Sequence, residues 1–153
     1  MDGMCAGPMV QKFRLSWDSD NQLLFEGTEG ACKGGRGKPG CEYDPASKTY
    51  SINPLLCRPD GGFFVYPESA SDYLIIVART DAQSKDPQDG SLKAIRVNAG
   101  QGLLLPPMSW HSPPLPLCED GSIEFVEKIN STDANLVIDL EAECGRKIEV
   151  VVD

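Results

Sequence analysis

The sequence predicts an all-β fold, a barrel or a sandwich of two sheets, with little helix. From residue 49 onward, short β-branched or alternating runs are separated by turn signals about every 8–12 residues, a pattern typical of such folds. No segment after residue 50 repeats its apolar residues with helical periodicity over several turns. The 153 residues fit one domain with a sizeable core.

A hairpin is expected near the start of the chain. Phe13, Leu15 and Trp17 alternate with polar residues, which predicts a strand over 11–17. The turn cluster DSDN follows, and residues 22–26 are the candidate return strand.

Residues 29–48 are expected to form a flexible loop. The segment holds five glycines and two prolines, so it buries little apolar surface. We therefore expect residues 1–48 to be an N-terminal extension with a hairpin and a flexible Gly-rich loop, and residues 49–153 to be the β domain.

Eight strands are expected in the β domain. They are, in order, 50–52, 62–67, 73–79, 92–98, 102–105, 123–130, 134–140 and 147–152. The run YLIIVAR at 73–79 is apolar almost without interruption, which predicts a strand covered on both faces. Residues 141–146 could form at most one helical turn.

The charge balance disfavours several classes of partner. Against 14 Lys and Arg stand 23 Asp and Glu, a net charge of −9, whereas nucleic-acid and anionic-membrane surfaces need concentrated positive charge. No run reaches the roughly 18–20 apolar residues of a membrane span. The N-terminus lacks the basic-then-apolar order of a signal peptide, so a cytoplasmic location is expected. The six cysteines are expected to be reduced thiols.

His111 is the first candidate for chemistry. It is the one histidine of the chain, and it lies between Trp110 and the stiff step Ser112-Pro113-Pro114. Histidine is the side chain best suited to transfer protons near neutral pH. A lone histidine without any role is the equally weighted alternative.

Residues 92–114, LKAIRVNAGQGLLLPPMSWHSPP, resemble the signature region of the ureidoglycolate lyases, small cupin-type β-barrels. The likeness lies in the strand from Leu92, the turn at 98–102 and the corner at 110–113, and it extends over about residues 50–153. It implies a cupin-like barrel that cleaves ureidoglycolate to glyoxylate and urea in purine (allantoin) catabolism. Two departures stand out: Arg58 occupies the place of a family histidine, and Ser112 occupies that of another.

The resemblance implies a role for each candidate residue. His111 would be the base that removes the hydroxyl proton and the acid that protonates the leaving nitrogen, and Lys93 would hold the substrate carboxylate. The expected substrate-binding residues are Arg58, Tyr66, Gln101 and Trp110. One histidine cannot supply the ligand set of a metal cupin, so neither a metal nor a cofactor is expected.

Two alternatives to the lyase remain open. The absence of the family's histidines favours a non-catalytic barrel that binds a small molecule or a partner. A structural or redox role for the cysteines is the third hypothesis, although a zinc site from Cys32, Cys41 and Cys57 would fit no common ligand spacing. A homodimer formed by sheet edges is also expected.

Overall fold

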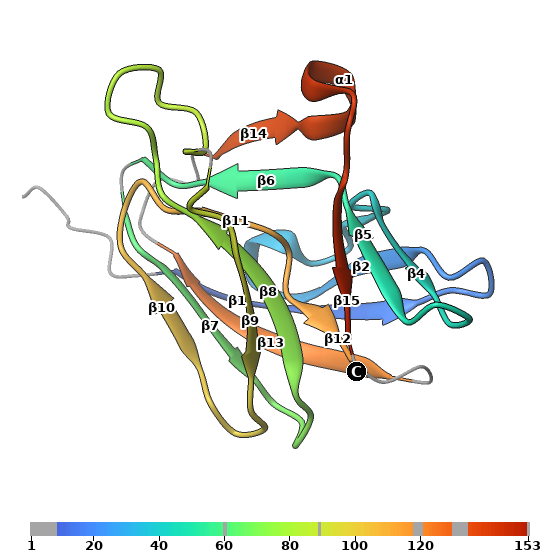
Figure 1. Ribbon diagram of the computed structural model, residues 1–153. Coiled ribbons are helices and arrows are strands. Elements are labelled where there is room, and N and C mark those ends of the chain that lie inside the picture. Colours follow the sequence, from blue (N-terminus) through green and yellow to red (C-terminus); the bar gives the residue numbers. More distant parts are fainter. Residues whose placement is uncertain (1–8, 60, 89, 118–120, 130–134, 153) are drawn as a thin grey trace, which may run out of the picture.

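Antiparallel strands form nearly all the regular structure of the chain (Figure 1). The computed structural model describes residues 9–59, 61–88, 90–117, 121–129 and 135–152. Within them the helical elements are one α-helix, α1 (Leu140–Cys144), and one 3-10 turn, η1 (Gly30–Cys32). The all-β prediction is therefore confirmed. None of the described helices has the length and apolar character needed to cross a bilayer.

The strands form three sheets. The first has the order β10-β7-β13-β1-β2-β3, and the second has the order β12-β8-β11-β6-β14 with β9 added beside β8. The third has the order β15-β5-β4. The strands of the first sheet are β1 (Met9–Trp17), β2 (Leu23–Glu29), β3 (Arg36–Gly37), β7 (Phe63–Pro67), β10 (Leu103–Leu105) and β13 (Ser122–Ile129). Those of the second are β6 (Pro54–Cys57), β8 (Tyr73–Ala78), β9 (Lys93–Val97), β11 (Trp110–His111), β12 (Leu115–Pro116) and β14 (Leu136–Asp139). Those of the third are β4 (Cys41–Asp44), β5 (Thr49–Ile52) and β15 (Ile148–Val151).

One apolar core joins the sheets. Alternate residues of β1 and β13 point into it, and Phe13 stacks on Phe125 with ring centroids 5.6 Å apart. From the second sheet, Tyr73 meets Phe125 edge-on at 5.2 Å, so the first and second sheets pack face to face. The strand β8 is buried along nearly its whole length, as its continuous apolar run predicts.

The hairpin near the N-terminus belongs to the body of the fold. β1 lies between β13 and β2, and its register with β13 runs from Met9 opposite Ile129 to Ser16 opposite Ser122. Residues 9–29 thus share a sheet and a core with residues beyond 49, and the boundary expected at residue 48 does not separate two units. The segment 29–48, expected as a loop, contains η1, β3 and β4.

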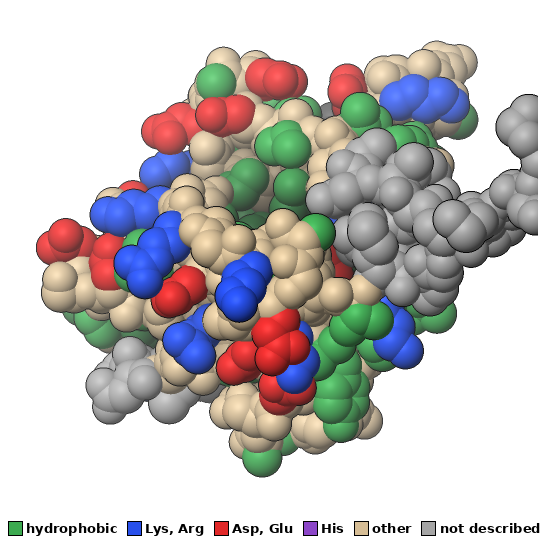
Figure 2. All heavy atoms as spheres, turned by 180° about the vertical axis from the view of Figure 1, so that it is seen from behind, with side chains coloured by type: hydrophobic (Ala, Val, Ile, Leu, Met, Phe, Trp, Pro, Cys, Tyr) green, Lys and Arg blue, Asp and Glu red, His purple; other side chains and the backbone are tan. Residues whose placement is uncertain are grey.

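Charged side chains cover the outward face of the first sheet. On this face Lys12 pairs with Glu68 at 2.9 Å and Arg14 with Glu124 at 3.6 Å. Figure 2 shows basic and acidic side chains intermixed around a hollow lined by apolar side chains. No histidine is visible on that face, in keeping with the burial of His111.

Candidate functional site

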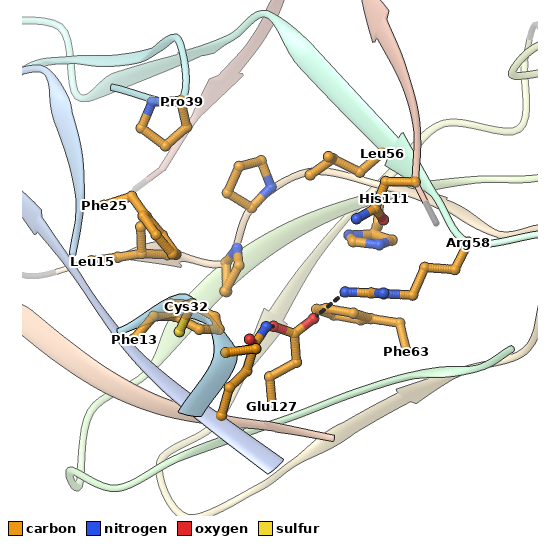
Figure 3. A pocket seen from close by; sticks show the side chains of 15 residues that line it. Phe13, Leu15, Phe25, Cys32, Pro39, Leu56, Arg58, Phe63, His111 and Glu127 are labelled. Carbon is orange, nitrogen blue, oxygen red and sulfur yellow. Dashed lines mark hydrogen bonds and ion pairs between the residues drawn. The ribbon is translucent and has the colours of Figure 1, made fainter. Parts of the chain in front are cut away.

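A pocket of about 310 Å³ lies between the first and second sheets (Figure 3). Its volume is near the lower end of the range of small-molecule sites, roughly 300–1,000 Å³. The walls are mainly apolar and include Phe13, Leu15, Phe25, Leu56, Phe63 and Pro113. The inward faces of the strands therefore supply both the apolar core and the walls of the pocket.

The polar part of the pocket is a buried chain of three side chains. Arg58 follows β6 and donates from Nη2 to Glu127 Oε1 at 2.7 Å (Figure 3). Gln11 donates from Nε2 to Glu127 Oε2 at 2.7 Å. Gln11 and Glu127 are direct partners in the register of β1 and β13, which explains their contact. The carboxylate charge is thus matched by the guanidinium, and each carboxylate oxygen accepts a hydrogen bond.

His111 lies on β11 in the middle of the second sheet and is only 3% exposed. Its ring stacks on Phe63, with centroids 4.1 Å apart and planes inclined by 21°. Nδ1 lies 3.0 Å from the Ser112 carbonyl oxygen. A carbonyl oxygen can only accept, so Nδ1 carries the proton and Nε2 of the neutral ring is an acceptor.

The protonation state of His111 follows from its surroundings. Burial lowers the pKa of His111 from 6.5 to about 4. The contact with Ser112 O opposes this lowering of the pKa, and the positive charge of Arg58 adds to it. At neutral pH the imidazole is therefore uncharged.

Two buried acceptors of the pocket lack a partner within the described part of the chain. One is His111 Nε2 and the other is Gln11 Oε1, whose residue is 7% exposed. Buried polar atoms in native proteins almost always have a hydrogen-bond partner. These two atoms therefore call for an explanation.

Two of the predicted site residues, His111 and Arg58, line this pocket. Trp110, the neighbour of His111 on β11, is buried with its indole Nε1 donating to Lys85 O at 3.2 Å. Successive residues of a strand point to opposite faces of the sheet. His111 therefore points to the pocket side, and Trp110 points to the other side.

The other predicted residues lie elsewhere. Lys93, on β9, is exposed and borders a separate hollow with Arg79. Tyr66 is 42% exposed on β7. Gln101 is an exposed turn residue whose carbonyl accepts from Tyr73 Oη at 3.3 Å. The structure does not bring these three side chains to the pocket, because their positions in sheet and turn direct them to solvent.

Two residues of the pocket, Gln11 and Glu127, were missed by sequence reasoning. The alternation of side chains along β1 and β13 could have identified them. Gln11 shares a face with Phe13 and Leu15, and Glu127 shares a face with Phe125. A polar residue on the apolar face of a strand must find partners inside the protein.

The described residues hold no group of three or more His, Cys, Asp or Glu arranged to bind a metal ion. Cys32 is a thiol whose Sγ donates to Lys12 O at 3.0 Å. Burial raises the pKa of the Cys41 thiol to about 12, and burial also raises that of Cys57. A thiol that stays protonated is a poor nucleophile, so Cys41 does not favour the redox hypothesis. Cys5 and Cys118 lie outside the described residues.

Comparisons with known proteins identify no family for this chain. No family model matches it, and neither does any curated protein. Among solved structures it is similar to a cupin 2 conserved barrel domain protein from Rhodopseudomonas palustris. The two share 12% sequence identity with a TM-score of 0.38, over 85% of this chain and 77% of that chain. A likeness of this degree carries no argument, so the lyase resemblance stays a prediction.

Proposed function

We propose that this protein binds a small, neutral and largely apolar molecule in the pocket between its sheets, without catalysing a reaction. The observation that carries the proposal is the charge balance of the pocket. Arg58 is paired with Glu127, and His111 is uncharged at neutral pH.

A charged ligand would be poorly accommodated in this pocket. Moving a carboxylate from water into an apolar site is costly unless a cation is available to pair with it. The guanidinium of Arg58 already faces Glu127 at 2.7 Å, and Lys93 lies outside the pocket. A neutral ligand avoids this cost and gains from contact with the apolar walls.

The acid–base properties of the pocket also favour binding over catalysis. General acid–base catalysis is most effective when the pKa of the catalytic group is near the working pH. The pKa of His111 is about 4, and its ring is fixed by the stack on Phe63 and the contact with Ser112 O. Such a ring is a weak base and a good hydrogen-bond acceptor.

The proposal is tested by calorimetric titration of the protein with three naphthalenes of similar shape. The neutral probes, 2-naphthol and 2-methoxynaphthalene, should bind saturably at one site. The anion 2-naphthoate should bind at least about tenfold more weakly, a difference of about 1.4 kcal/mol. Absence of saturable binding for both neutral probes would refute the proposal.

A pair of variants ties the binding to the pocket. Ala31 is exposed and lies on the pocket's edge, so Ala31→Trp should obstruct it without disturbing the core. Ala46 is an exposed turn residue that does not line the pocket, and Ala46→Trp is the matched control. Loss of binding in the first variant and not in the second is expected. Equal binding in both would place the ligand elsewhere.

The lyase is the second candidate function, favoured by the presence of the Trp110–Pro113 corner and of His111 Nε2 in the pocket. In this hypothesis Arg58, rather than Lys93, would face the substrate carboxylate. Ureidoglycolate added to the protein should then release glyoxylate, with and without a chelator. His111→Asn should lower turnover about 100-fold, the usual scale for a lost acid–base group. No release of glyoxylate would exclude this candidate.

A further inference from the structure

We propose that the ligand of this pocket is a hydrogen-bond donor, a neutral phenol-like molecule whose hydroxyl donates to His111 Nε2. This inference rests on the proposed binding function and adds the chemical class of the ligand. It follows from two buried atoms of the pocket that lack partners, His111 Nε2 and Gln11 Oε1, which are both acceptors.

The tautomer of His111 is fixed by its neighbour. Nδ1 lies 3.0 Å from Ser112 O, and the tautomer without a proton on Nδ1 would set two lone pairs against each other. The proton therefore stays on Nδ1. The buried Nε2 presents a lone pair and has no proton to give, so it matches a donor.

The orientation of the Gln11 amide is fixed in the same way. Its Nε2 donates to Glu127 Oε2 at 2.7 Å, and a flipped amide would place its oxygen against the carboxylate. Oε1 is thus left as the second acceptor without a partner. Glu127 is itself held by Arg58, so the orientation of the amide depends on the whole chain of contacts.

The walls favour an aromatic body for the ligand. Phe13, Phe25 and Phe63 line the pocket, and the Phe13 and Phe25 rings lie tilted with centroids 5.4 Å apart. Aromatic rings pack favourably at edge and face over such distances. A phenol combines an aromatic body with one donor at its rim. It also stays uncharged at neutral pH.

The inference is tested by comparing 2-naphthol with 2-methoxynaphthalene, which has the same ring system and no donor. The naphthol should bind roughly 10- to 100-fold more tightly, the scale for leaving a buried acceptor without a partner. In His111→Phe, which keeps a ring against Phe63 and removes Nε2, this preference should disappear, so that 2-naphthol binds no more tightly than the ether.

A second measurement needs no variant. His111 is the one histidine of the chain, so its two ring-nitrogen NMR signals need no assignment to a residue. The Nε2 signal should shift on addition of 2-naphthol in the direction of a hydrogen-bonded nitrogen, and it should stay nearly unchanged with the ether. Equal affinity for the two probes, or an unchanged Nε2 signal with bound naphthol, would overturn the inference and leave the binding function standing. Failure of both probes to bind would refute the binding function itself.

Discussion

The buried histidine should make the stability of this protein fall as the solution becomes mildly acidic. The pKa of His111 is about 4 in the folded protein and 6.5 in its ordinary state, so the unfolded chain binds more protons between these values. The contribution of the neutral His111 to the stability is fully present above about pH 6.5 and is lost as the pH falls toward about 4. The free energy of unfolding should therefore be about 2 kcal/mol lower at about pH 5 than at about pH 7.5.

The effect of His111 on stability falls in a higher pH range than the effect of the aspartates. Hydrogen bonds hold the pKa values of five aspartates below their usual value, so these groups stay ionised in the folded protein at about pH 5. They are Asp18, Asp44, Asp72, Asp81 and Asp139. Their stabilising contribution is present above their unfolded pKa and is lost only at lower pH.

Urea unfolding at a series of pH values measures the effect, with His111→Phe as the variant that lacks the titrating group. The wild-type curve should slope between about pH 7 and pH 5, and that of the variant should be nearly flat. An NMR titration of the single histidine gives its folded pKa directly. A folded pKa near 6.5, or equal slopes in the two proteins, would refute the reasoning.

Three further predictions concern the fold. Glu127→Leu leaves the buried guanidinium of its arginine partner without its carboxylate and should cost about 3–5 kcal/mol in urea unfolding; a cost under about 1 kcal/mol would contradict the burial of the pair. Gly27→Ala places a Cβ 1.8 Å from a backbone oxygen of η1 and should lower the melting temperature, whereas Gly37→Ala, with open space around it, should change it little. Limited proteolysis should cut first next to Lys33, Arg36 or Lys38, which are all exposed, and first cleavage within 73–79 would count against the assigned core.

The long strands were predictable from the sequence because their signal is local. Alternation in β1 and β13 and the continuous apolar run of β8 appear in single windows of sequence. β6 and β11 were missed for the opposite reason. Pro54–Cys57 forms a strand by pairing with β11 and β14, and Trp110–His111 forms one by pairing with β6 and β8. Such pairing depends on tertiary contacts that no short window contains.

The candidate site was predictable in part. His111 and Arg58 were selected from the sequence and do line the pocket, whereas Lys93 was selected by resemblance alone and lies outside it. Gln11 and Glu127 could have been identified from the alternation of side chains along a strand, because each lies on the apolar side of its strand. Their meeting with Arg58 was not predictable, since it depends on how the first sheet packs on the second.

The chain of contacts among Gln11, Glu127 and Arg58 is better explained by specificity than by stability. Burying an ion pair costs desolvation, and apolar side chains of similar volume often give equal or greater stability. In this protein the pair joins β13 of the first sheet to the residue after β6 in the second. It also fixes the amide of Gln11 with its oxygen unpartnered, in the same pocket as a histidine whose tautomer is fixed by Ser112. In this pocket the charges of Arg58 and Glu127 offset each other, and the buried acceptors His111 Nε2 and Gln11 Oε1 lack partners. Under the proposed binding function, these two acceptors would favour ligands that donate a hydrogen bond.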